Sequence, residues 1–226
     1  MILANILLQG TVATGVEKEM SMSLADLYFA GGWVMHVISV LSLAALYIFV
    51  ERFLVIRKAT KADINFMNRI KDYMYEGKVD AALQLCRSTN TPHARMVEKG
   101  ITRLGRPLGD VSTAIENVGK MEIYKLEKSF PTLATIAGAA PLLGFFGTVI
   151  GMVQAFYEMS QAGNSLDIST LSGGIYVALL TTVWGLIVSI LSYFAYNYLV
   201  IRVENVVFRL QATSEEFMDI LNEPVK

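Results

Sequence analysis

The residues best suited to chemistry are hydroxyls and small side chains in two long segments that carry no charge. The first segment contains Gly138, Ala139, Ala140, Gly144, Gly147, Thr148 and Gly151. The second contains Gly174, Ala178, Thr181, Thr182, Gly185, Ser189 and Ser192. Small residues let helices pack closely in lipid, and a hydroxyl there can bond the carbonyl one turn back. A narrow path for water or protons also needs small side chains with hydroxyls, so composition alone leaves both interpretations open.

Other reactive groups are few. His36 lies in a third segment without charge, near its outer end and just after Trp33. We favour an interfacial or packed histidine over a role in an ion pathway. His93 is far away in the sequence, so no metal-ligand spacing exists, and the single Cys86 is expected to pack as a small hydrophobe. No nucleophile–base pair or phosphate loop is present, so we predict no enzyme, no cofactor and no metal site.

The composition is that of a membrane protein. The chain has 226 residues, of which 54% are hydrophobic and only 17% are charged, with a formal net charge of −1. Soluble domains have about a quarter of their residues charged. The charge balance provides no basic footprint for nucleic acid, which we therefore do not expect as a partner.

Three stretches contain no Asp, Glu, Lys or Arg: Leu27–Val50, Ser129–Tyr157 and Ile168–Ile201. Each exceeds the roughly 20 residues that cross a bilayer, so we predict three transmembrane helices. The third stretch would measure about 50 Å as a helix and should project out of the bilayer. Beyond it, helical spacing of apolar residues predicts an amphipathic continuation packed on a neighbouring helix: Val203, Val207, Leu210, Phe217 and Leu221.

Basic residues predict the orientation, since 15 of the 19 Lys and Arg lie between residues 51 and 128. By the positive-inside rule this segment is cytoplasmic and the N-terminus is outside. The predicted segments are a periplasmic 1–26, a first span 27–50, a cytoplasmic helical domain 51–128, a second span 129–157, a short periplasmic loop 158–167, a third span 168–201 and a cytoplasmic helical tail 202–226. A multi-pass membrane protein with its N-terminus outside and its C-terminus inside fits this order.

Helical spacing also predicts four helices in the cytoplasmic domain: Ala62–Glu76, Val79–Ser88, Ala94–Leu104 and Val111–Leu126. In the second span, Pro141 should kink the helix or free a carbonyl, because proline has no N–H to donate. Three spans with two faces of small residues can bury only some of those faces within one chain. The sequence therefore also predicts a homo-oligomer.

Two motifs resemble those of a known family. The second span reads Ala140-Pro-Leu-Leu-Gly-Phe-Phe-Gly-Thr-Val-Ile-Gly-Met152, which is similar to the APLLGLLGTVIGM signature of the MotA/TolQ/ExbB proton-channel family. The third span, from Gly174 to Leu186, resembles that family's GIxxALxTTxxGL motif, and Glu51-Arg-Phe53 resembles its usual exit from the first span. Three spans with a large loop after the first resemble ExbB and TolQ rather than the four-span MotA.

The resemblance implies an all-α membrane protein with three transmembrane helices and long cytoplasmic helical extensions. It implies a homopentamer whose second and third spans surround a central pore. The pore would hold the single helices of an ExbD/TolR-like partner, each with a transmembrane Asp, and proton passage would drive a TonB-like or TolA-like periplasmic effector. By motif, Thr148 and Thr182 match the pore-lining threonines, with Thr181 beside them. The small residues and the proline of the motifs would pack helices at the pore: Pro141, Gly144, Gly147, Gly151, Gly174, Ala178 and Gly185.

One position departs from the family's pattern. ExbB and TolQ usually carry a Glu five residues before the threonine of the second motif, and this chain has Val177 there. A threonine hydroxyl can pass a proton but cannot hold a charge, so a partner must supply the carboxylate of a proton relay. We expect an ion-driven motor subunit that couples the proton motive force to work at the outer membrane or in the periplasm. The alternative is a passive oligomeric scaffold without ion flux, which Val177 slightly favours.

Overall fold

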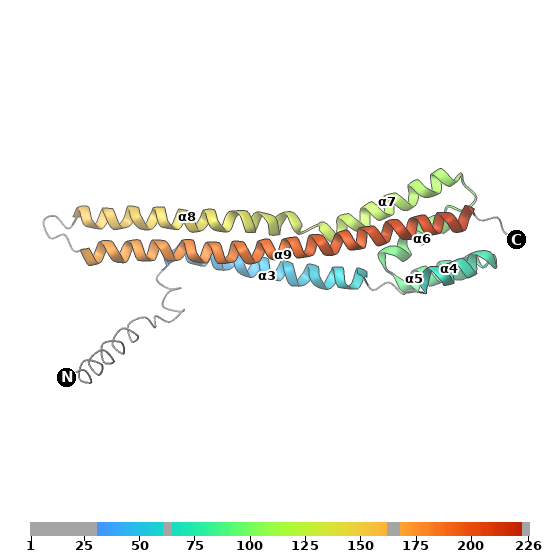
Figure 1. The fold of residues 1–226 in the computed structure, drawn as a ribbon, viewed down its shortest axis with the longest axis horizontal. Helices are drawn as coiled ribbons and strands as arrows, with labels where there is room; N and C mark the ends of the chain where they lie inside the picture. Colours follow the sequence, from blue (N-terminus) through green and yellow to red (C-terminus); the bar gives the residue numbers. More distant parts are fainter. Residues whose placement is uncertain (1–30, 61–64, 162–167, 223–226) are drawn as a thin grey trace, which may run out of the picture. The chain divides into compact units, whose positions relative to one another are not determined.

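The computed structural model describes residues 31–60, 65–161 and 168–222, and within these ranges every regular element is an α-helix. The helices are α3 (Gly32–Thr60), α4 (Phe66–Tyr75), α5 (Val79–Thr89), α6 (Pro92–Ile101), α7 (Leu108–Glu127), α8 (Phe130–Gln161) and α9 (Ile168–Asn222). Figure 1 shows them along the chain. The N-terminal segment 1–26 and most of the loop 158–167 lie outside the described residues.

Three helical stretches are long and apolar enough to cross a membrane, which confirms the three predicted spans as candidates. They lie in α3, in residues Leu108–Gln161, which include α8, and in Leu171–Asn222 of α9. The predicted continuation of the third stretch is also confirmed, because α9 runs without a break to Asn222. Val203, Leu210 and Phe217 on this continuation are buried as predicted, whereas Val207 and Leu221 are half-buried and their neighbours Val206 and Ile220 are buried instead.

The chain divides into two compact units. The first comprises residues up to Leu43 together with Ala137–Ile190. Here α8 and the first part of α9 run side by side (Figure 1). The start of α3 contributes the buried Val34, Met35 and Ile38. The ring of its Trp33 meets Phe146 of α8 edge to face, with 6.4 Å between centroids.

The second unit comprises Ala44–Ile136 and Leu191–Lys226 and contains the four short helices α4 to α7. All four were predicted, and their ends differ by a few residues. Helix α6 begins at Pro92 rather than Ala94, because Pro92 fits the first helical turn and the Thr91 hydroxyl accepts a hydrogen bond from the Ala94 N–H at 3.3 Å. The chain then leaves α6 after Ile101, three residues earlier than expected, and turns through Gly105 at a φ of 85°.

Packing in the second unit brings α6 against α7 and the end of α9. Gly100 on α6 lies directly beneath the Phe217 ring and close to Ile115, so a side chain there would collide with both. The buried Glu122 carboxylate on α7 is held by Arg95 and by Lys125, whose Nζ lies 2.6 Å away. Cys86 on α5 is buried, and that burial raises the pKa of its thiol to about 12. A packed, unreactive thiol fits both observations.

His93 on α6 gives the second unit a dependence on pH. Its side chain is 4% exposed, and neither ring nitrogen has a hydrogen-bond partner in the described part of the chain. Burial, and then the positive charge of Arg209, lower the pKa of His93 below its ordinary value of 6.5. Between the pKa of His93 in the folded protein and its value of 6.5 in the unfolded chain, the unfolded chain therefore binds more protons than the folded chain does. The contribution of the neutral His93 side chain to the free energy of unfolding is therefore fully present above pH 6.5. It is lost as the pH falls from 6.5 toward the pKa of His93 in the folded protein.

We therefore expect the thermal unfolding midpoint of the detergent-solubilised protein to fall on acidification from about pH 7.5 to 5.5, and His93→Gln to flatten that fall. The chain has only two histidines. His36→Gln is thus the matched control, and it should leave the fall in place. Identical pH profiles for the wild-type protein and His93→Gln would contradict the assignment.

Candidate functional site

The motif residues of α8 and α9 form one line of close contact, which we call the α8–α9 seam. It consists of Gly144, Gly147 and Gly151 on α8 and Gly174, Ala178, Thr181 and Gly185 on α9. A Cβ atom on Gly151 would lie 2.8 Å from the Ala178 Cβ, and one on Gly144 would lie 2.9 Å from the Thr181 carbonyl oxygen. Facing numbers rise on one helix as they fall on the other, so the helices are antiparallel. At this spacing glycine is required, because any side chain would force the backbones apart.

Two hydroxyls of α9 converge on one main-chain oxygen of α8. The Thr181 Oγ1 lies 3.1 Å from the Gly144 carbonyl oxygen, and the Thr182 Oγ1 lies 3.2 Å from it. The single O–H of Thr181 is shared between this oxygen and the Ala178 carbonyl oxygen one turn back, which lies 2.7 Å from Oγ1. A carbonyl oxygen has two lone pairs, so it can accept from both threonines. These bonds tie α9 to α8 where the glycines bring the backbones closest.

The three threonines differ in access. Thr181 is 2% exposed and Thr148 is 8% exposed, whereas Thr182 and Val177 are half-buried. The Thr148 Oγ1 donates to the Phe145 carbonyl on its own helix at 2.6 Å. Thr182 therefore lies at the margin of the seam, and Thr181 lies inside it. The hydroxyls of these threonines can pass protons, but the seam contains no side chain that holds a charge near neutral pH.

Pro141 leaves a carbonyl of α8 without its helical donor, as the sequence predicts. In a helix the N–H of residue 141 would bond the carbonyl of Ala137, and proline has no N–H. The Ser189 Oγ of α9 donates to that carbonyl at 2.7 Å instead. Helix α8 continues through Pro141 from Phe130 to Gln161. A hydroxyl of α9 thus replaces the missing backbone bond and couples the proline to the partner helix.

Ser189→Ala should therefore destabilise the protein by about 1–3 kcal/mol, the cost of a buried carbonyl without a donor. The cost should shrink in a Pro141→Ala background, because alanine restores the helical N–H. The measurement is a double-mutant cycle on thermal or denaturant unfolding in detergent, with an expected coupling of about 1 kcal/mol. Additive effects of the two substitutions would show that Ser189 does not act through the Ala137 carbonyl.

The structure brings together the glycines and the alanine named for helix packing, Gly144, Gly147, Gly151, Gly174, Ala178 and Gly185, but not Gly138, which has nothing within 4 Å of a Cβ position. It adds two residues that the motifs did not single out. Ala155 packs against Gly174, and Ala137 accepts the Ser189 hydroxyl. The signal for Ala137 was present in the sequence, since it precedes Pro141 by four residues. Within the described residues, no three His, Cys, Asp or Glu side chains cluster in a way that would hold a metal ion.

Comparisons with known proteins identify the same motif region. Residues 88–212, more than half of the chain, match the model of the MotA/TolQ/ExbB proton channel family. A protein named as an ExbB homolog from Methanothermobacter thermautotrophicus is 25% identical over 84% of this chain and 67% of its own length. TolQ of the Tol-Pal system of Pseudomonas aeruginosa is 34% identical over 51% of the chain and 49% of its own length. The biopolymer transport protein ExbB of Aquifex aeolicus is 40% identical over 41% of the chain and 63% of its own length.

The match to the family model includes the whole α8–α9 seam, with Pro141 and the three threonines. The aligned parts amount to between about half and two thirds of these relatives' lengths. The chain is an all-helical membrane protein that belongs to the MotA/TolQ/ExbB proton channel family.

Proposed function

We propose that the chain is the oligomeric subunit of an ion-driven motor in the bacterial inner membrane. With an ExbD/TolR-like partner, it would couple the proton motive force to work at the outer membrane or in the periplasm. The observation that carries the proposal is the α8–α9 seam, which presents threonine hydroxyls within two stretches, 129–157 and 168–201, that contain no Asp or Glu. The names of its relatives, ExbB and TolQ, support the same role.

The residues of the seam would have two separate roles, helix packing and lining of the pore. Gly144, Gly147, Gly151 and Gly185 hold the two helices together, while the half-buried Thr182 would face the pore with Thr148 beside it. Exposed apolar side chains on α8 and α9 offer surface to lipid or to neighbouring subunits, among them Leu142, Phe145, Val149, Leu179 and Val183. Five copies around a central pore, as in the family, would cover part of this surface.

The partner must bring the titratable group, because Val177 stands where ExbB and TolQ usually have a glutamate in the third span. A single-span protein with an Asp in its helix fits that requirement, and a TonB-like or TolA-like effector would receive the motion. The basic segment 51–128 indicates a cytoplasmic helical domain and a cytoplasmic C-terminus, with the N-terminus in the periplasm. These assignments follow the family and the distribution of charge.

The test is proton flux into liposomes that contain the chain together with its single-span partner, followed with a pH-sensitive dye. We expect flux that depends on the partner's transmembrane Asp and disappears in the Asp→Asn partner. Flux that is unchanged by Asp→Asn would contradict the proposed relay.

The second candidate is a passive scaffold that positions a partner without ion flux. Val177 favours it, since the spans then contain no acidic group of their own. Assembly of the complex without proton flux under any imposed gradient, while the intact system still performs its work in cells, would establish the scaffold instead.

A further inference from the structure

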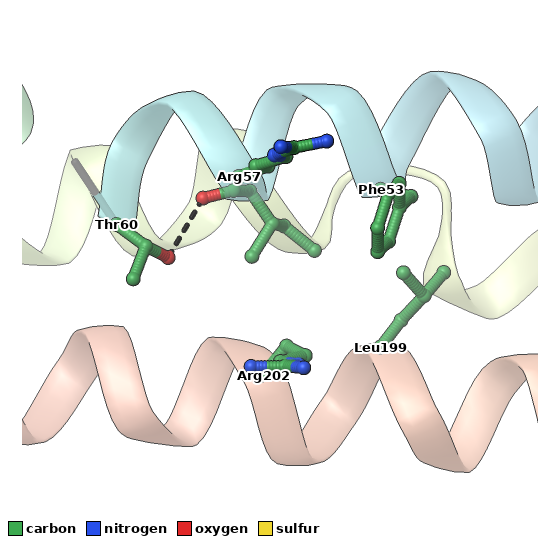
Figure 2. A pocket seen from close by; sticks show the side chains of 6 residues that line it. Phe53, Arg57, Thr60, Leu199 and Arg202 are labelled. Carbon is green, nitrogen blue, oxygen red and sulfur yellow. Dashed lines mark hydrogen bonds between the residues drawn. The ribbon is translucent and has the colours of Figure 1, made fainter.

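A pocket in the second unit lies between α3 and α9, outside the α8–α9 seam. Its volume is about 300 Å³, and it is lined by Phe53, Ile56, Arg57 and Thr60 of α3 and by Leu199 and Arg202 of α9. In Figure 2, Phe53 and Leu199 lie at one end of the pocket and Thr60 at the other, with the two arginines between them. The pocket therefore combines an apolar wall with two guanidinium groups that come from different helices.

The positive charge of this pocket is not neutralised by the described part of the chain. None of its six lining residues is acidic. Arg202 donates from Nε and Nη2 to the Tyr198 hydroxyl, at 3.1 and 2.8 Å, and its guanidinium lies 5.1 Å from the centre of the Tyr198 ring. These contacts orient Arg202 without removing its charge. No described carboxylate lies within 4.0 Å of Arg57 or Arg202.

The position along both helices places the pocket at a membrane surface. Arg202 is the first charged residue after the charge-free stretch Ile168–Ile201, and Arg57 follows Leu27–Val50 by two turns. Leu54 and Ile201 beside the pocket are exposed large apolar residues, as expected of side chains that meet lipid. Basic pockets between membrane helices on the cytoplasmic side match the phosphate of a lipid headgroup.

We propose that this pocket binds an anionic phospholipid of the cytoplasmic leaflet. The guanidiniums of Arg57 and Arg202 hold the headgroup phosphate from two sides, since arginine presents planar pairs of N–H donors that match phosphate oxygens. The start of an acyl chain lies along Phe53 and Leu199. The lipid thereby links α3 to α9 at the membrane surface, which is a role separate from ion flux.

The experiment measures phosphatidylglycerol retained by the full-length protein after purification from mild detergent, by native mass spectrometry and by phosphorus assay. We expect the wild-type protein to retain phosphatidylglycerol. The Arg57→Gln/Arg202→Gln variant should retain at least about fivefold less phosphatidylglycerol per protein. In phosphatidylcholine nanodiscs, added phosphatidylglycerol should raise the unfolding temperature of the wild-type protein and not that of the double variant. Circular dichroism and size-exclusion profiles check that the double variant is folded and assembled.

Lys58→Gln is the matched control, because it removes one exposed positive charge beside Arg57 without changing a lining residue. It should retain phosphatidylglycerol as the wild-type protein does. Equal loss in Lys58→Gln and the double variant would overturn the proposal in favour of general surface attraction. Full retention by the double variant would overturn it as well. The same thermal shift with millimolar inorganic phosphate in place of the lipid would identify a free anion as the occupant and also overturn it.

Discussion

Replacing Gly185 by leucine should prevent α8 and α9 from packing, and the protein should fail to accumulate in a folded, assembled form. A Cβ atom at Gly185 would lie 2.6 Å from the carbonyl oxygen of Ala140 and 3.0 Å from the Cα of Gly144. Both are main-chain atoms, so no side-chain rotation can relieve the contact. The helices would have to separate, which would also pull the Thr181 and Thr182 hydroxyls away from the Gly144 carbonyl.

Gly185→Ala is the graded form of the same test. Overpacking costs about 1–3 kcal/mol, and the gain in helix propensity from glycine to alanine, about 1 kcal/mol, offsets part of that cost. The measurement is the unfolding temperature and the yield of assembled protein in detergent. Gly138→Ala is the matched control on α8, because nothing lies within 4 Å of a Cβ there. It should be neutral or slightly stabilising, and a Gly185→Ala protein that is stabilised as much as Gly138→Ala would refute the role of the seam.

The three spans and the short helices could be predicted from the sequence because the physics behind them is local. Absence of charge over more than 20 residues identifies a span, and apolar spacing identifies a helix face. The error at the start of α6 came from weighing the apolar pattern above the Thr91–Pro92 pair, although capping fixes a helix start more precisely than periodicity does.

The candidate site was predictable in composition but not in geometry. The sequence named the small residues of both helices, yet it could not say which face which, because the pairing depends on the register of α8 against α9. The bond from Ser189 to Ala137 and the two hydroxyls on Gly144 depend on that register. The pocket of Arg57 and Arg202 was missed for a related reason, since its halves come from helices far apart in the sequence.

The motif threonines should separate packing from proton transfer. If the Thr182 hydroxyl serves the ion path, Thr182→Val should lower proton-driven activity by at least about a hundredfold. A loss of that size is typical of removing a group that transfers a proton. Valine keeps the volume and the branched shape, so the oligomer should assemble normally. Thr182→Ser keeps the hydroxyl and should retain most of the activity. Thr182→Ala and Thr148→Ala should behave as Thr182→Val does.

Thr135→Val is the matched control for these threonine variants, because Thr135 is an exposed threonine of α8 whose hydroxyl bonds only its own helix, at the Pro131 carbonyl. It should leave both assembly and function intact. Two quantities are measured in cells for each variant: the activity that depends on the proton gradient, and the amount of assembled complex. Unchanged activity in Thr148→Ala and Thr182→Val would remove both threonines from the ion path. Because the Thr182 hydroxyl bonds the Gly144 carbonyl, equal losses of assembly and activity would assign it to packing alone. Loss of activity with full assembly is the result that places it on the path.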